Sequence, residues 1–232
     1  MTQPPPVLKP GGLAEVVRAE EIIARAVFDG ATLMVGGFGL VGMPLTLVSA
    51  LNASPFRDLT VISNNLAERG RYLGQTLRLG KLRRTIGTYF TTNPDVGRAY
   101  LDGKIQITLV PQGTLAEAMR AGGAGIGGFY TPTAVGTELA EGKETRVIAG
   151  KEYLFQEAIT ADVALIRAHK ADRLGNLVYY KTARNFNPVM ATAARFVIAE
   201  VDEIVEVGEL DPESIVTPHL YVDCLVIALE KL

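Results

Sequence analysis

Apolar residues recur along this chain in two spacings, one typical of helices and one typical of buried strands. From Ala19 to Val27 they fall three and four residues apart, which predicts an amphipathic helix with Gly30 as its C-terminal cap. The next apolar run, Ala31–Val35, ends at glycine and predicts a short buried strand. The chain thus opens with a helix followed by a strand.

The same alternation continues to the C-terminus. Further helices are predicted at 45–52, 72–82, 96–101 and 114–121, and further strands at 59–63, 83–87, 105–110, 163–167, 196–201 and 225–229. Strands alternating with helices indicate βαβ units around a mainly parallel sheet that is flanked by helices on both faces. The glycine-rich segment Ala121–Thr137 is predicted to be a long functional loop between elements.

No fixed-period repeat and no interdomain linker interrupts this pattern, so residues 13–232 are predicted to form a single α/β domain. Residues 1–12 contain four prolines and two glycines, and we expect them to be a flexible tail. They lack the apolar core of a signal peptide, and no apolar run reaches the roughly 20 residues of a membrane span. The sequence therefore predicts a cytoplasmic protein that does not enter membranes.

The composition narrows the possible chemistry. Lys and Arg number 23 against 25 Asp and Glu, so the overall basic field of a nucleic-acid-binding protein is absent. One cysteine and two histidines exclude a zinc site with several Cys ligands and argue against a His-rich metal centre. We expect no metal, a structural role for His169 and an inert buried thiol at Cys224.

Glycines are the most distinctive feature, and one cluster of them matches a nucleotide-binding pattern. VGGFGLVG contains a literal G-x-G-x-x-G at Gly37, Gly39 and Gly42, directly after a predicted strand. An NAD-dependent oxidoreductase is therefore one hypothesis. It is weakened because the next strand ends in Asn64 and Asn65, where an acidic residue would bind the ribose. The glycines fit equally a tight turn with positive φ, or a loop that lets a ligand approach the backbone.

Longer motifs point elsewhere. The run Asp29–Pro44 resembles the glycine-rich signature of family I CoA-transferases. The segments ISNN (62–65), VPQGTLAE (110–117), RAGGAGIGGFYTPTAVGTELAEGKE (120–144) and KTARNFNP (181–188) look like those of the A subunit of 3-oxoacid CoA-transferases, in the same order. The resemblance extends from about Ala19 to Val226 and implies the open α/β fold of that family.

The resemblance also implies a function. Such enzymes move CoA from succinyl-CoA to a 3-oxoacid, here 3-oxoadipate or acetoacetate, by a ping-pong mechanism through a glutamyl-CoA thioester. The nucleophilic Glu belongs to a Ser-Glu-Asn-Gly motif in the B half, and that motif is missing here. The expected partner is thus a separate B subunit, in a heterodimer or an α2β2 assembly. The CoA thioester is a substrate, and no cofactor is expected.

The matching motifs also indicate candidate site residues. Gln112 corresponds to a proposed oxyanion donor of the family, although a Gln at this place could simply satisfy loop backbone groups. Substrate or CoA contacts are expected at Gly36, Gly37, Phe38, Gly39, Asn64 and Asn65. Paired asparagines could equally build a turn, and Phe38 could belong to the core. A third hypothesis is a non-catalytic protein whose glycine loops bind a CoA-like ligand.

Overall fold

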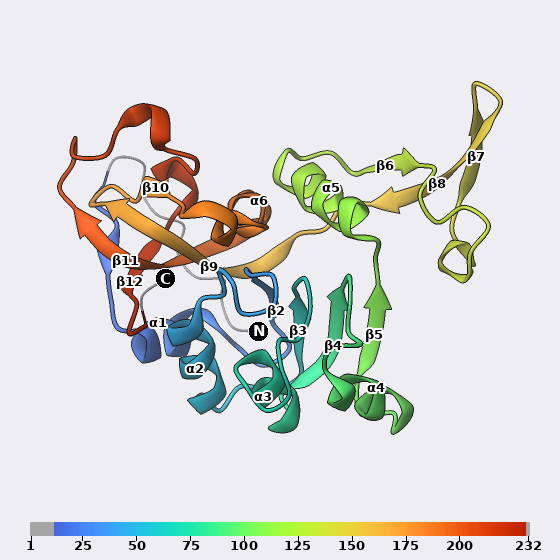
Figure 1. The fold of residues 1–232 in the computed structure, drawn as a ribbon, viewed down its shortest axis with the longest axis horizontal. Coiled ribbons are helices and arrows are strands. Elements are labelled where there is room, and N and C mark those ends of the chain that lie inside the picture. The colour runs from blue at the N-terminus through green and yellow to red at the C-terminus, as the bar shows by residue number, and fades with distance from the viewer. Residues whose placement is uncertain (1–11, 231–232) are drawn as a thin grey trace.

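In the computed structural model, which describes residues 12–230, the predicted strands assemble into a nine-stranded sheet (Figure 1). Its order is β1-β12-β11-β9-β2-β3-β4-β5, with β10 paired to β9, and every pairing is parallel except β10–β9. The open, mainly parallel sheet is thereby confirmed. The tail predicted for residues 1–12 lies outside the described residues, apart from the exposed Gly12.

The elements of this sheet are mostly short. Its strands are β1 (Glu15–Val16), β2 (Thr32–Val35), β3 (Leu59–Ile62), β4 (Leu82–Gly87), β5 (Gln106–Leu109), β9 (Ala161–Asp172), β10 (Leu177–Val178), β11 (Ala194–Val205) and β12 (Cys224–Ile227). The α-helices are α1 (Ala19–Ala26), α2 (Leu45–Ala53), α3 (Leu73–Arg78), α4 (Pro94–Leu101), α5 (Gln112–Gly123) and α6 (Asn187–Ala193). Within residues 12–230, no helix has the length and apolar character needed to cross a membrane.

The helices cover both faces of the sheet, as predicted. Leu33 and Val35 of β2 belong to a core shared with α1–α4, whereas Met34 between them belongs to a second core shared with α5 and α6. This division follows from the strand geometry, because successive side chains point to opposite faces. Figure 1 shows α1–α4 gathered on one side of the sheet and α5 and α6 on the other.

Some predicted details are wrong. Helix α1 ends at Ala26, Val27 is already extended, and Gly30, with φ of 83°, forms the turn before β2 instead of capping the helix. Strands β9 and β11 have 12 residues each, about twice the predicted length. Their second halves carry Arg167, Glu200 and Asp202, which are buried and paired with one another. The predicted strands end just before polar residues become frequent, at His169–Lys170 and at Asp202–Glu203.

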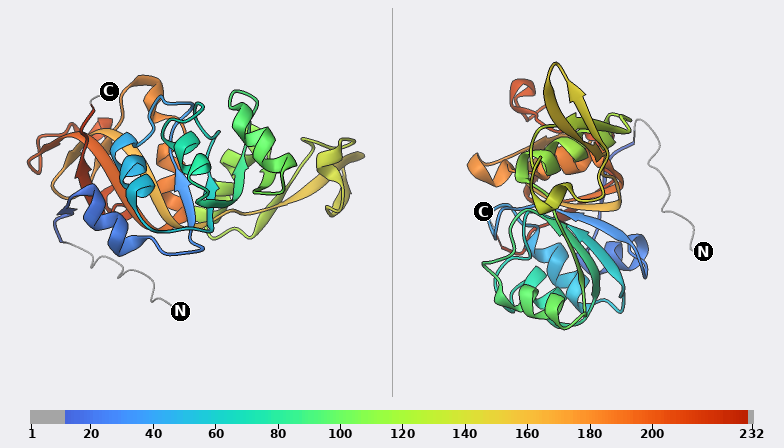
Figure 2. Two further views of the ribbon diagram at one scale, coloured as in Figure 1. Left: turned by 90° about the horizontal axis from the view of Figure 1, so that it is seen from below. Right: turned by 90° about the vertical axis from the view of Figure 1, so that its right-hand side faces the viewer.

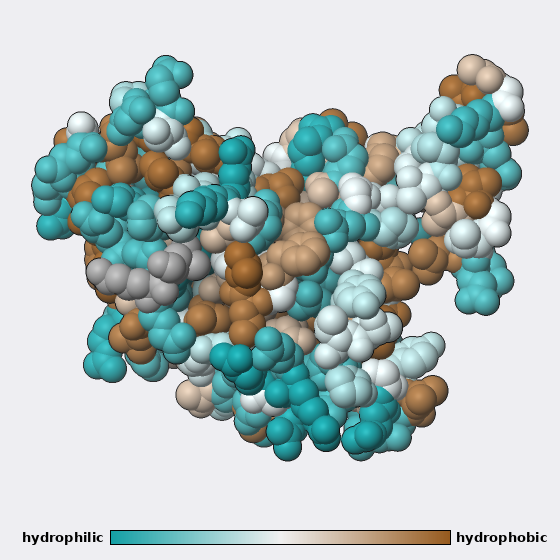
Figure 3. All heavy atoms as spheres, in the orientation of Figure 1, coloured by the Kyte–Doolittle hydropathy of each residue, from teal (hydrophilic) through white to brown (hydrophobic). Residues whose placement is uncertain are grey.

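The segment Ala121–Thr137, predicted as a loop, instead completes α5 and forms β6 (Gly128–Thr131). β6 pairs with β8 (Lys151–Glu157), which pairs with β7 (Thr145–Ile148), in an antiparallel sheet that projects from the body (Figure 1, Figure 2). A Cβ on Gly128 would lie 2.4 Å from the Phe155 ring, so glycine is needed there for ring packing, not for flexibility. Figure 3 shows apolar residues on the surface of this projecting sheet. Val147 of β7 is 70% exposed.

The single cysteine provides a first test of the core. Cys224 is buried in β12, and burial raises the pKa of its thiol to about 12. Because only the thiolate attacks a disulfide reagent, we expect the native protein to leave Ellman's reagent unreacted at pH 8. The same protein in denaturant should release one equivalent of product. Rapid stoichiometric reaction of the native protein would contradict this packing.

Candidate active site

The carboxyl ends of β2, β3, β4 and β5 lie around one pocket of about 550 Å³. Five residues predicted from the sequence line it: Phe38, Gly39, Asn64, Asn65 and Gln112. Five further lining residues were not predicted: Ala67, Glu68, Thr88, Tyr89 and Thr92. Open parallel sheets bind ligands at this edge, so the predicted residues meet where a site is expected.

Gln112 is the first residue of α5, and the oxygen of its side-chain amide is hydrogen-bonded within the protein. Its Oε1 accepts a hydrogen bond from Asn64 Nδ2 at 3.1 Å. The other hydrogen of that Asn64 amide goes to Thr88 Oγ1 at 2.8 Å. No group within residues 12–230 accepts a hydrogen bond from Gln112 Nε2. Gln112 therefore presents an oriented amide donor at an exposed position on the pocket wall.

Asn64 and Asn65 are both buried, and their side chains also build the turn that follows β3. Asn65 Nδ2 donates to Asn64 Oδ1 at 2.9 Å, and Asn65 Oδ1 accepts from the Ala67 N–H at 2.8 Å. With both its amide hydrogens used on Thr88 and Gln112, Asn64 acts mainly on its neighbours. The pair thus forms a turn, as paired asparagines often do, and the same turn orients Gln112.

Phe38 stands on a small hairpin at the other side of the pocket. Its N–H donates to the Val41 carbonyl at 2.9 Å, and the Val41 N–H donates back at 3.3 Å, leaving Gly39 and Leu40 at the tip. Phe38 is 51% exposed, so it belongs to the pocket wall and not to the core. Gly39, with φ of 62°, faces open space, because a Cβ added there would meet no atom within 4 Å.

Gly36 and Gly37 do not line the pocket. A Cβ on Gly36 would lie 1.8 Å from Asn187 Oδ1, and one on Gly37 would lie 3.0 Å from the Met43 Cα atom. The bare backbone here lets other parts of the same chain approach. This is a third use of the glycines, beside the tight turn and the ligand contact.

The packing also bears on the dinucleotide hypothesis. Of the three glycines that match its pattern, Gly37 is closed against Met43, and a Cβ on Gly42 would lie 2.2 Å from the Ala183 carbonyl oxygen. Only Gly39 of the three is open to a ligand. Because the pyrophosphate of a dinucleotide must come close to this backbone, the geometry does not favour an NAD site.

The segment KTARNFNP meets the glycine loop through its asparagines. Its cationic residues Lys181 and Arg184 are exposed and do not line the pocket. Instead Asn187 Nδ2 donates to the Gly42 carbonyl at 2.9 Å, and Asn185 Oδ1 accepts from the Gly37 N–H at 3.1 Å. The only hint in the sequence was the Asn-x-Asn-Pro pattern. The meeting of this segment with the glycine loop required the tertiary structure.

A buried charge cluster lies behind the glycine loop, away from the pocket. Arg167 is 1% exposed and donates to the carboxylates of Glu200 and Asp202 and, at 2.7 Å, to the Glu230 carbonyl. Burial raises the pKa of Glu200, and the Leu47 N–H at 3.0 Å and Arg167 oppose that rise. His169 Nδ1 lies 3.0 Å from Asp202 Oδ2, so His169 belongs to this cluster and not to the pocket.

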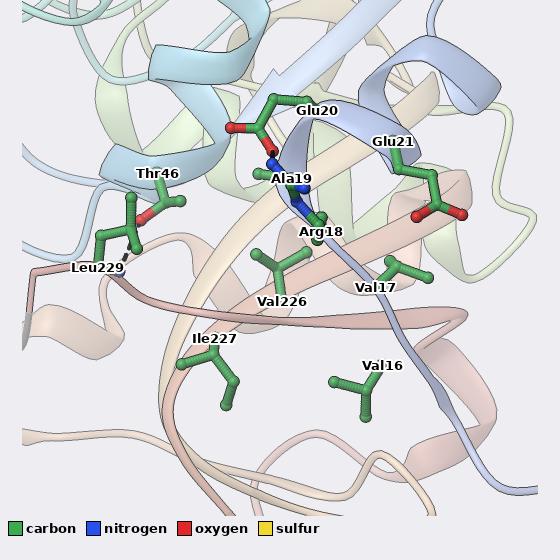
Figure 4. A pocket seen from close by; sticks show the side chains of 10 residues that line it. All are labelled: Val16, Val17, Arg18, Ala19, Glu20, Glu21, Thr46, Val226, Ile227 and Leu229. Carbon is green, nitrogen blue, oxygen red and sulfur yellow. Dashed lines mark hydrogen bonds and ion pairs between the residues drawn. The ribbon is translucent and has the colours of Figure 1, made fainter.

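A second cavity, of about 530 Å³, lies between β1, the start of α1 and the end of β12 (Figure 4). Arg18 and Glu20 are paired there at 3.6 Å, and the Leu229 N–H donates to Thr46 Oγ1 at 3.0 Å. None of the predicted site residues lines this cavity. In the described part of the chain, no group of three or more His, Cys, Asp or Glu residues is placed to hold a metal ion.

Known proteins resemble this chain along almost its whole length. The family model described as "Coenzyme A transferase" matches residues 16–228. The A subunit of the succinyl-CoA:3-ketoacid coenzyme A transferase of Xanthomonas campestris pv. campestris (strain B100) is 51% identical over 221 residues, covering 95% of this chain and 91% of that protein. The A subunit of the 3-oxoadipate CoA-transferase of Pseudomonas putida is 50% identical over 211 residues, covering 89% of this chain and 91% of that protein.

Among solved structures, the acyl-CoA transferase apoenzyme from Escherichia coli O157:H7 superposes with a TM-score of 0.85 at 25% identity. The match covers 99% of this chain but 49% of that chain, so this chain spans about half of its length.

Proposed function

Because the chain belongs to the coenzyme A transferase family, we propose that it is the A subunit of a two-chain enzyme that moves CoA from succinyl-CoA to a 3-oxoacid. The observation that carries the proposal is the identity of about half of all residues with relatives that bear such names, along nearly their whole length. The acceptor is 3-oxoadipate or acetoacetate. The CoA thioester is the substrate, and no further cofactor is proposed.

The pocket supports this role because it offers an oriented amide donor, Gln112, but no well-placed nucleophile. Glu68 supplies the only carboxylate among the pocket-lining residues, and it is paired with Arg71 at 2.9 Å with 58% of its side chain exposed. Anhydride and thioester intermediates require a site from which water is excluded. We therefore assign the nucleophilic Glu to a separate B subunit, in a heterodimer or an α2β2 assembly.

In the proposed reaction, the partner's carboxylate attacks the acyl carbonyl of succinyl-CoA and expels the CoA thiolate, leaving an anhydride. The thiolate then attacks the glutamyl carbonyl, which releases succinate and forms the glutamyl-CoA thioester. The 3-oxoacid reverses both steps. Each attack places negative charge on a carbonyl oxygen, and a fixed amide donor stabilises that charge without itself titrating. We assign this task to Gln112 Nε2, because Asn64 orients the amide from behind.

The other predicted residues take lesser roles in this proposal. Phe38 and Gly39 form the wall beside the acyl group, since both line the pocket. Asn64 and Asn65 hold Gln112 and the turn, and Gly36 and Gly37 shape the loop without touching substrate. The cytoplasmic location expected from the sequence stays a prediction.

Co-expression tests the function directly. The chain should be produced with a B-type subunit that carries the Ser-Glu-Asn-Gly motif, and succinyl-CoA should be assayed with acetoacetate and with 3-oxoadipate. We expect transfer only when both chains are present. Inactivity with both acids, in a complex that assembles, would contradict the proposal. Binding of CoA by the isolated chain together with such inactivity would favour the non-catalytic alternative.

A substitution of Glu68 tests whether the nucleophile lies in this chain. Glu68→Gln keeps the shape of the side chain and removes its charge, so we expect kcat in the two-chain enzyme to change no more than about threefold, because an exposed ion pair contributes little. Hydroxylamine trapping during turnover should place the reactive thioester on the partner. A loss of activity of a thousandfold in this variant would instead make Glu68 the nucleophile.

A further inference from the structure

The hairpin that carries Phe38 and Gly39 is fixed at its base by one side chain from a distant part of the sequence. Asn185 Oδ1 accepts the Gly37 N–H at 3.1 Å, immediately before the hairpin. Asn185 Nδ2 donates to the Val41 carbonyl at 3.0 Å, at the hairpin's other end. One amide group therefore bridges both strands of the hairpin across 148 and 144 residues of sequence.

Asn185 is itself held in place. Its Oδ1 also accepts the Phe186 N–H at 2.8 Å, and its Nδ2 also donates to the Ala183 carbonyl at 3.1 Å. Next to it, the fully buried Asn187 accepts the Arg167 N–H at 2.8 Å and donates to the Gly42 carbonyl. The loop that presents Asn185 is thus attached to β9 at the centre of the sheet.

Besides Asn185, the hairpin is held by the Asn187 bond to the Gly42 carbonyl and by Leu40, which packs against the core. Phe38 and Val41 are each 51% exposed, and the backbone bonds between them close only the tip. Gly39 and Gly42 have positive φ values, 62° and 68°, and glycine there permits many other backbone conformations. Without Asn185, the hairpin would lose the side chain that bonds to Gly37 on one side and to Val41 on the other.

We propose that Asn185 is a positioning residue of the active site, which sets the hairpin so that Phe38 and Gly39 form the pocket wall beside the acyl group. Asn185 does not line the pocket and acts only through Gly37 and Val41. The effect on catalysis rests on the proposed transferase function, whereas the effect on the hairpin does not. Two separate measurements therefore test the two parts.

The first measurement follows the hairpin in the full chain. The protein has no tryptophan, so Phe38→Trp introduces a single indole, excited selectively over the eight tyrosines, at the hairpin. We expect Asn185→Ala in this background to lower the steady-state anisotropy of the indole and to raise its acrylamide quenching constant about twofold. Asn176→Ala is the matched control, because Asn176 is also half-buried and bridges Asp172 and His219 in another loop. Equal anisotropy in Phe38→Trp alone, with Asn185→Ala and with Asn176→Ala, with unchanged circular dichroism, would overturn the proposal.

The second measurement uses the two-chain enzyme without the reporter. A merely structural defect lowers the amount of active enzyme, and hence apparent kcat, but leaves KM unchanged. A displaced pocket wall should raise KM for the 3-oxoacid, and we expect Asn185→Ala to raise it at least fivefold and to lower kcat/KM ten- to hundredfold. Asn185→Asp keeps the acceptor for Gly37 but not the donor for Val41. Its KM for the 3-oxoacid should lie between those of the wild type and Asn185→Ala. An unchanged KM in both variants would contradict a positioning role even if kcat falls.

Discussion

Replacing Gln112 with alanine is expected to lower kcat of the two-chain enzyme about a hundredfold, the usual cost of removing one oxyanion donor. The amide meets the substrate oxygen most strongly once that oxygen carries charge, so the loss should appear in kcat and hardly in KM. Because Asn64 Nδ2 holds Gln112 Oε1 at 3.1 Å, the donor is already oriented before substrate arrives. The expected loss follows from this preorganisation.

Steady-state kinetics of three variants would test this assignment. Gln112→Glu replaces the donor by a carboxylate of nearly equal shape and should be at least as damaging as Gln112→Ala. Asn64→Ala leaves the donor present but unrestrained, so its kcat should lie between those of the wild type and Gln112→Ala. A kcat within twofold of the wild type for Gln112→Ala would return this residue to a purely structural role in the loop.

The largest expected loss of stability comes from the buried charge cluster. Replacing Arg167 with methionine should lower the free energy of unfolding by about 3–5 kcal/mol, because it leaves buried carboxylates without their cation. Glu200 is fully buried, and Arg167 donates to both its carboxylate and that of Asp202. The contacts also reach Glu230, so the C-terminal segment should loosen together with β9 and β11.

Urea unfolding at several pH values would measure this loss and its origin. Burial already holds the pKa of Glu200 above its ordinary value of 4.5, and removing Arg167 should raise it further. A carboxyl group whose pKa is raised by folding binds its proton more tightly in the folded state. Proton binding by Glu200 therefore stabilises the folded state below pH 4.5, and this stabilisation is lost as the pH rises through the folded pKa. The loss in free energy of unfolding of Arg167→Met, relative to the wild type, should therefore grow from pH 4.5 to neutrality.

An exposed ion pair provides the control. Arg120→Met removes the partner of Glu117 at 2.6 Å, on the surface of α5. We expect little change in the free energy of unfolding, with no marked pH dependence, because solvent screens such pairs. Similar losses for Arg120→Met and Arg167→Met would show that burial of the cluster does not account for the effect.

Sequence patterns predicted those parts of the molecule in which local and tertiary preferences agree. The short strands β2 and β3 are mostly apolar runs, and both were located to within one residue. The ends of β9 and β11 were missed because they carry charged residues such as Lys170 and Glu203, which pair with each other across the neighbouring strands. Local sequence carries no sign of such compensation.

The same distinction applies to the candidate site. Gln112 and Asn64 follow strands β5 and β3, and since parallel strands end at one edge, their proximity could be anticipated. The contacts of Asn185 could not be anticipated, because its partners Gly37 and Val41 are brought to it only when β2 pairs with β9. The projecting sheet was hidden for another reason, since its glycines suggested a loop while Phe155 packs on Gly128.

The pairing of β2 with β9 also has a consequence for how the chain folds as it leaves the ribosome. Strands β2 to β5 each pair with the next in sequence and can form while the first half is made. The other edge of β2 pairs with Ala161–Asp172, and Thr32 donates to Asp162 across 130 residues. Until that strand is synthesised, β2 is an open apolar edge of the kind that pairs with other chains. Nascent chains that stall before residue 161 should therefore depend on chaperones to stay unaggregated.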